Sequence, residues 1–307
     1  MNSLSVFLGS LADQIRNMGW YFLLAVILAA SIKTFKLDKK IRHLLEKAGM
    51  YSIPLAVFTG LVSPLCSCGI MPVAASLMVA GVPAAPVMAL LITSPVMSPD
   101  AFVLTMGVLG KGIALGKLLG AAGFGLALGY LVHFMAVRGK LAELKLADGG
   151  GRFEHHCVDP LDPDDPRRGL TVTIGRFKYF GLMVMDMVWI IGRFLVLAMI
   201  LEALMITFVE PDLVRMLIGR PSFTSPLLAV AVGLPFPLQQ IAAVPIVRGL
   251  LDLGTNPGAA MALLMAGPVT SIPAIAFLAG LVNRRLLWAY LLVGLTGSLI
   301  LGFIYLA

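Results

Sequence analysis

The sequence predicts an all-α polytopic membrane protein made of two inverted repeats, and three observations support this fold class. Of its 307 residues, 59% are hydrophobic and only 13% are charged, whereas a soluble domain has about 45–50% apolar and about 25% charged residues. Apolar segments recur in the same order in both halves of the chain. Prolines interrupt some of these segments at corresponding positions. Because too little polar surface is available to cover the apolar residues, lipid must be part of the solvent.

Charge and cysteine content exclude several other classes. The net charge of +7 comes mostly from Lys and Arg in short segments between apolar runs, which is the distribution that membrane orientation produces. We therefore expect a lipid bilayer and no nucleic acid as partner, and a multi-pass position in the cell inner (cytoplasmic) membrane. Cys66 and Cys68 form a tight pair and Cys157 stands alone, which does not indicate a disulfide framework. No nucleotide-binding motif occurs, so we expect neither an enzyme nor a bound cofactor.

The predicted elements follow in order along the chain, each marked by an apolar run and ended by charge, glycine or proline. A first span is followed by a basic segment, two short apolar pieces, an interrupted span and a full span. After a polar stretch the same order returns. The expected positions are 18–34, 33–47, 51–63 with 69–80, 83–109 with a break at 94–99, 113–134, 180–209, two pieces around 235–240, a break at Gly267–Pro268, and 286–305.

The internal repeat is the most informative feature of the sequence. Without any gap, the first half matches the second at an offset of 173 positions, as from Gly60 to Gly233. Shared Leu and Ala carry little weight in apolar sequence, but matched Pro and Gly over a long stretch are rarely accidental. The matched pairs include Gly60/Gly233, Pro64/Pro237, Pro72/Pro245, Gly81/Gly254, Pro95/Pro268, Ser98/Ser271 and Gly129/Gly302.

The chain divides into three parts around its only long polar stretch. Residues 1–135 form the first membrane repeat, residues 136–178 form a polar cytoplasmic linker, and residues 179–307 form the second membrane repeat. The linker mixes charges of both signs with a run of glycines at 149–151 and several prolines. This composition is typical of a loosely ordered linker.

The short pieces 51–63 and 69–80 decide the topology. A helix of about 12 residues covers about 18 Å, well below the thickness of about 30 Å of the hydrocarbon core. The two pieces form either one broken crossing or a re-entrant hairpin that enters and leaves on one side. The hairpin puts both the basic segment 33–47 and the linker in the cytoplasm, as the positive-inside rule requires, although Lys111 and Lys117 then lie outside. We expect six full spans and two re-entrant hairpins, with eight spans as the alternative.

The two broken hairpins predict a chamber near the middle of the membrane. Irregular backbone at membrane depth occurs only where it is buried in protein or lines a cavity. Pro64 and Pro237 each interrupt a helix, which frees carbonyls on one side and presents amide donors at the positive end of the next half-helix. Interrupted segments at corresponding positions of two halves indicate the binding site of a transporter.

The chemistry of this chamber is unequal on its two sides. The first break contains Cys66, Ser67 and Cys68, and the second contains Gln239 and Gln240. Sulfur ligands favour a thiophilic substrate, such as a trivalent organoarsenical or a soft metal ion, and amides both donate and accept hydrogen bonds. The alternatives are that the thiols only pack as small apolar residues and that the amides satisfy the broken backbone. Neither break contains a charged residue, which argues against a strongly charged substrate.

Further polar residues are candidates for the site, for ion coupling and for metal binding. Four hydroxyl residues either line the chamber or satisfy carbonyls freed by the prolines. Ionisable residues inside apolar spans are coupling candidates, with structural ion pairs as the alternative. A short His/Cys cluster in the linker is a weak metal candidate. The three groups are Ser94, Ser98, Thr270 and Ser271; Asp100, Asp186, Arg193 and Glu202; and His155, His156 and Cys157.

One string of residues carries a family resemblance. The run from Pro64 to Gly69, Pro-Leu-Cys-Ser-Cys-Gly, is followed by Pro72 and by a Ser94-Pro95 break. It resembles the predicted-permease family that includes YraQ-like permeases and organoarsenical efflux permeases, over about 20–135 and 180–306. The resemblance implies thiophilic substrate binding at Cys66 and Cys68. This chain departs from the family at 77–80, where several Arg are common, and in lacking cysteines in its second half.

The sequence therefore predicts a permease that moves a small neutral or thiophilic solute by alternating access, in the direction of efflux if the resemblance holds. Two alternatives remain open. One is uptake of a sulfur-containing or anionic solute held by half-helix N-termini. The other is a membrane redox or assembly subunit that uses the Cys pair. The sequence also leaves open whether the protein acts as a homodimer.

Overall fold

A computed structural model describes residues 49–63, 67–79, 82–138, 225–233, 243–252 and 254–306, together with single positions at 27, 181, 184, 185 and 188. Every described segment is helical or a turn between helices, and no strand occurs in these ranges. The expectation of an all-α protein is therefore confirmed for this part of the chain. The expected spans at 18–34 and 180–209 and nearly all of the linker at 136–178 lie outside the described ranges.

The first half contains five described helices after a short 3₁₀ turn. Pro99 occupies the first turn of α6, where its missing N–H costs no helical bond. Gly110 has a φ of 91°, a backbone conformation that suits glycine and reverses the chain between α6 and α7. The elements are η1 (Gly49–Tyr51), α3 (Ser52–Val62), α4 (Ser67–Val79), α5 (Ala84–Thr93), α6 (Pro99–Val108) and α7 (Lys111–Val137).

The second half also contains five described helices. The side chain of Asn256 accepts a hydrogen bond of 2.8 Å from the Gly258 amide and so caps α14, while Pro257 fills the first helical position. The helices are α12 (Ser225–Gly233), α13 (Ala243–Asp252), α14 (Pro257–Val269), α15 (Ile272–Leu281) and α16 (Arg284–Ile304).

The break in the second half differs from the expected position at Gly267–Pro268. Helix α14 continues through Pro268 and ends at Val269. Both the amide and the hydroxyl of Thr270 donate to the carbonyl oxygen of Ala266, each over 2.9 Å. These two bonds close the last turn beyond the proline, so the interruption lies at Thr270–Ser271.

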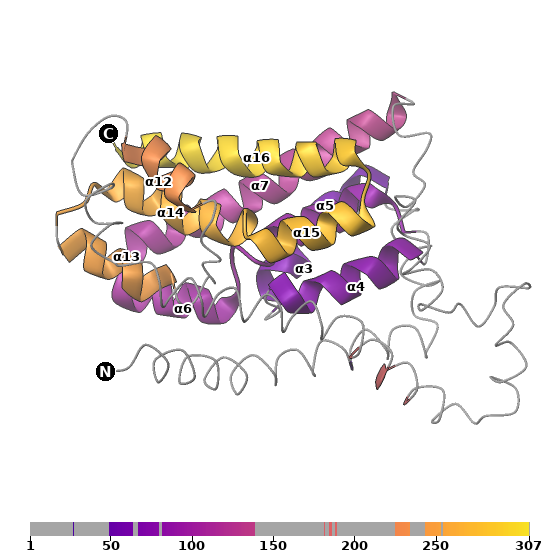
Figure 1. Ribbon diagram of the computed structural model, residues 1–307, viewed down its shortest axis with the longest axis horizontal. Helices are drawn as coiled ribbons and strands as arrows, with labels where there is room; N and C mark the ends of the chain where they lie inside the picture. Colours follow the sequence, from indigo (N-terminus) through magenta and orange to yellow (C-terminus); the bar gives the residue numbers. More distant parts are fainter. Residues whose placement is uncertain are drawn as a thin grey trace, which may run out of the picture.

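The long helices α7 and α16 run antiparallel along the long axis of the molecule (Figure 1). The hydroxyl of Tyr305, just after α16, donates to the carbonyl of Gly112, at the start of α7, over 2.8 Å. Farther along, the ring of Phe124 packs directly on Gly297. Within the described ranges, α7 and α16 are the two helices that are long and apolar enough to cross a membrane.

Among the helices that the structure describes, α5 and α14 are the most deeply buried. Helix α5 packs between α3 and α7, and α14 packs between α12 and α16. Nine of the ten residues of α5 are buried, and so is every residue of α14 from Gly258 onward. The chain breaks that follow these two helices therefore lie inside the protein.

Helices α3 and α4 form a hairpin beside α5. Gly60, near the end of α3, packs against Thr93 at the end of α5, so the two helices reach the same level. Helix α4 then returns, because Val79 at its end shortly precedes Ala84 at the start of α5. In the second half, Gly233 at the end of α12 packs against Leu263 of α14. Helices α4 and α13 lie toward opposite ends of the long axis (Figure 1).

Candidate functional site

The break after α5 is a tight turn of buried polar backbone. Thr93, Ser94 and Ser98 are almost completely inaccessible. The carbonyl of Thr93 accepts hydrogen bonds from the amides of Val96 and Met97, over 3.2 Å and 3.1 Å. Ser98 is extended, and its carbonyl accepts the amide of Phe102 over 2.8 Å to start α6. The serines of this break thus lie in the protein interior, and their place in a substrate chamber stays a prediction.

The break after α14 has a related structure. Thr270 is fully buried and Ser271 nearly so. The Thr270 hydroxyl donates to the Ala266 carbonyl, and the carbonyl of Ser271 accepts the amide of Ile275 over 3.0 Å to start α15. The Thr270 hydroxyl therefore bonds to the backbone of its own helix, at a carbonyl that also accepts the Thr270 amide.

The structure describes the cysteine-containing break only from Ser67 onward. Ser67 and Cys68 begin α4, so their amides belong to the first turn, whose N–H groups have no partner within the helix. This agrees with the half-helix N-terminus predicted there. The side chains of Ser67 and Cys68, and the whole of Pro64, Cys66, Pro237, Gln239 and Gln240, lie outside the described structure.

The contact between Gly60 and Thr93 still relates two of the predicted segments. Gly60 belongs to the last turn of α3, just before the undescribed segment 64–66. Thr93 immediately precedes Ser94, the first residue of the α5 break. The end of α3, which leads into the cysteine segment, and the end of α5, which leads into the serine-containing break, therefore lie side by side.

Among the coupling candidates, Asp100 lies in the first turn of α6 and is exposed. The positive end of the helix dipole stabilises a carboxylate at that position. Asp186, Arg193 and Glu202 lie outside the described ranges, as do His155, His156 and Cys157. In the part of the chain that the structure describes, no cluster of three or more His, Cys, Asp or Glu side chains can hold a metal.

Lys117 is a polar residue whose burial the sequence analysis did not predict. The re-entrant topology places it toward the outer side of the membrane, and its side chain is fully buried in the protein. It belongs to the inward stripe of α7 that continues through Ala121, Phe124 and Leu128. This spacing of three and four residues was readable from the sequence and could have placed Lys117 on the inner face.

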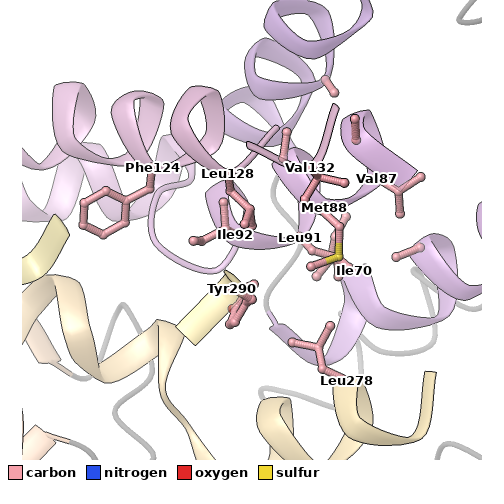
Figure 2. Close-up of a cluster of buried hydrophobic side chains, with 14 of the residues drawn as sticks. Ile70, Val87, Met88, Leu91, Ile92, Phe124, Leu128, Val132, Leu278 and Tyr290 are labelled. Atoms are coloured by element: carbon pink, nitrogen blue, oxygen red, sulfur yellow. The ribbon is translucent and has the colours of Figure 1, made fainter. Parts of the chain in front are cut away.

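Tyr290 occupies the corresponding place in the second half, since it follows Lys117 by the repeat offset of 173 positions. It is 1% exposed. Figure 2 shows Tyr290 at the border between helices of the two halves, near Ile92 and Leu128 of the buried hydrophobic cluster. The two long helices thus each bury one large polar side chain at equivalent positions.

Comparison with known proteins adds the following matches. The sequence matches the family described as "Predicted permease" over residues 7–306. It is 24% identical to the UPF0718 protein YcgR of Bacillus subtilis over 304 residues, which cover 96% of this chain and 95% of that protein. It is 31% identical to the UPF0718 protein MJ0584 of Methanocaldococcus jannaschii over 96 residues, which cover 31% of this chain and 26% of that protein. No solved structure gives a significant match.

Proposed function

Because the chain belongs to the predicted-permease family, which it matches from residue 7 to residue 306, we propose that it moves a small neutral or thiophilic solute across the cell inner membrane by alternating access. Membership of this family makes the protein a transporter rather than an enzyme. The observation that carries the proposal is the pair of buried helix breaks at Ser94–Ser98 and Thr270–Ser271. They follow α5 and α14, the two most deeply buried of the described helices. Such paired interruptions are the usual position of a transporter's binding site.

The two halves are structural repeats in this proposal, and the packing of paired glycines supports it. Gly129 of α7 packs against Ala89 of α5, and Gly302 of α16 packs against Ala262 of α14. Each residue of the second contact follows its counterpart by 173 positions. The helix pairs in contact repeat as well: α4 touches α15, and α6 touches α13.

The repeats are inverted relative to one another. Helices α7 and α16 correspond in sequence and run antiparallel (Figure 1). Phe124 and Gly297 are themselves separated by the repeat offset, and they touch, as expected for residues beside a pseudo-twofold axis. The hairpins α3–α4 and α12–α13 then enter from opposite faces of the membrane. This arrangement gives two gates that rocking of one half against the other opens in turn.

The assignment of a thiophilic substrate rests on Cys66 and Cys68, which flank Ser67 at the start of α4. Trivalent arsenic and soft metal ions bind thiolates in preference to oxygen ligands. We expect everted membrane vesicles that contain the protein to accumulate methylarsenite, as an efflux permease would. Replacing both cysteines by serine should reduce the initial rate of uptake at least about tenfold, equivalent to ~1.4 kcal/mol of lost interaction.

Cys157→Ser provides the matched control, because it removes the only other thiol of the chain. Its vesicles should accumulate methylarsenite at the rate of the unmodified protein. If the Cys66→Ser, Cys68→Ser variant transported methylarsenite normally, the thiol part of the proposal would be wrong. If the unmodified protein accumulated none, the substrate assignment itself would be wrong.

A further inference from the structure

Lys117 is buried where a lysine is costly. It follows Lys111, the first residue of α7, by six positions, or about 9 Å along the helix axis. Lysines near the ends of membrane helices normally extend their ammonium to the interface. Lys117 instead has no accessible surface, and its Nζ atom has no hydrogen-bond partner within the described residues.

Structural packing does not account for this side chain. Leu or Met would fill the same volume beside Ala121 and Phe124 without desolvating an amino group. A buried ammonium without a partner is strongly destabilising. Ionisable residues in membrane helices therefore mark pathways and relays for protons or ions.

Few charged or titratable groups of the described helices surround Lys117. Among the described helices that pack against α7, neither α3, α5 nor α14 contains a titratable residue. Helix α6 contributes Asp100, whose charge attracts Lys117 without forming an ion pair in the described structure. The turn after α16 contributes Tyr305, whose hydroxyl is bonded to Gly112, while the other titratable residues of α16, Arg284, Arg285 and Tyr290, lie toward its opposite end.

Lys117 also lies where the two halves meet. Its neighbour Gly116 packs against Tyr305, and Gly120, one turn farther, packs against Met265 and Leu301. All three partners belong to the second half. Any rocking of one half against the other changes the surroundings of this part of α7, and with them the cost of charge on Nζ.

We propose that Lys117 is the proton-coupling residue of the permease, with Asp100 as its counter-charge. The inference rests on the proposed transport function. In the conformation described here the burial of Nζ penalises the charged form of Lys117. A change of conformation exposes it to water, where Nζ takes up a proton with its lone pair and Asp100 balances the charge. When the site then opens to the other side of the membrane, the N–H bond breaks, the electron pair stays on Nζ, and the proton passes to water there.

Thermal unfolding of the purified full-length protein in detergent tests the buried amine without any substrate. Lys117→Met should unfold at a higher temperature than the unmodified protein at pH 6, because burying the ammonium destabilises the unmodified fold. The difference should shrink by at least about 3 °C as the pH rises to 10 and the amine loses its proton. Lys111→Met removes an exposed lysine of the same helix and should show no such pH dependence. A Lys117→Met difference that is the same at every pH would overturn the proposal.

Transport in proteoliposomes tests the coupling. Two rates are compared with methylarsenite as the probe: exchange at equal pH on both sides, and accumulation driven by a pH gradient. In Lys117→Met and in Lys117→Gln, the ratio of driven accumulation to exchange should fall at least tenfold, whereas Lys111→Met should keep the ratio of the unmodified protein. An unchanged ratio in both Lys117 variants would also overturn the proposal. If the unmodified protein does not exchange methylarsenite, the proposed function is wrong, and the unfolding experiment still decides the role of Lys117.

Discussion

The hydroxyl of Tyr305, in the turn after α16, donates a 2.8 Å hydrogen bond to the carbonyl oxygen of Gly112, in the first turn of α7. The bond joins residues 193 positions apart and fastens the end of one long helix to the beginning of the other. The ring of the same tyrosine packs on Gly116. Two halves that are far apart in sequence are thus attached at one end of their shared interface.

Removing this hydroxyl should weaken the attachment. Tyr305→Phe keeps the ring on Gly116 and loses only the hydrogen bond, so we expect a loss of about 0.5–1.5 kcal/mol in the free energy of unfolding. Tyr130→Phe is a suitable control, because Tyr130 is an exposed tyrosine of α7. Thermal unfolding in detergent measures both variants. Equal unfolding temperatures for Tyr305→Phe and the unmodified protein would show that the bond contributes nothing to stability.

The middle of the interface depends on a glycine. A Cβ atom at Gly297 would overlap the ring of Phe124, whereas no described atom lies within 4 Å of one at Gly123. Gly297→Ala should therefore destabilise the fold by about 1–3 kcal/mol through overpacking. Gly123→Ala should be neutral or slightly stabilising, because alanine is the better helix former. The prediction fails if the two variants unfold at the same temperature.

The sequence predicted the order of the described elements well, because proline, glycine and charge mark helix ends directly. The break at Ser94–Ser98 and the beginning of α6 at Pro99 follow from proline chemistry alone. The break near Pro268 was predicted a few residues before its observed position in the chain. A proline in the last turn removes only one helical bond, and Thr270 closes the turn with its hydroxyl. The carbonyl to which a hydroxyl donates depends on the folded backbone conformation, so the amino-acid composition does not predict it.

The burial of Lys117 was missed for a different reason. Counting charges between apolar runs treats each lysine as a loop residue that reports the side of the membrane. A lysine on the inward stripe of a long helix carries no such information. The predicted cysteine and glutamine site lies in segments that the structure does not describe, so it stays a prediction.

The Thr270 hydroxyl offers a direct test of structural against substrate-binding roles. Thr270→Val keeps the shape of the side chain and removes the donor to Ala266. Because the site is fully buried, we expect the free energy of unfolding to fall by about 1 kcal/mol. Thr93→Val loses a bond of the same kind, the 2.7 Å bond from the Thr93 hydroxyl to the Ala89 carbonyl. Its free energy of unfolding should fall by a similar amount. A Thr270→Val protein of unchanged stability that needs more methylarsenite for half-maximal uptake would instead indicate contact with the substrate.

The proposed inverted arrangement predicts that two residues related by the repeat offset are exposed on opposite sides of the membrane. Lys111 and Arg284 are the first residues of α7 and α16, both are exposed, and they are separated by the repeat offset. We expect a cysteine at position 111 to react with a membrane-impermeant maleimide added outside intact cells. A cysteine at position 284 should react only in everted vesicles, because the inverted repeat turns the beginning of α16 toward the cytoplasm.

The labelling requires a background in which the three native cysteines are replaced by serine, with the total reactive cysteine measured after detergent treatment. Labelling of both positions from the same side would contradict the inverted repeat, because helices that correspond in sequence would then begin on one face. It would also remove the physical basis for two gates, since parallel repeats would bring both hairpins in from one side. Opposite labelling would instead leave Lys117, near the beginning of α7, closer to the outer face than to the cytoplasm, and so set the side from which its proton is first taken.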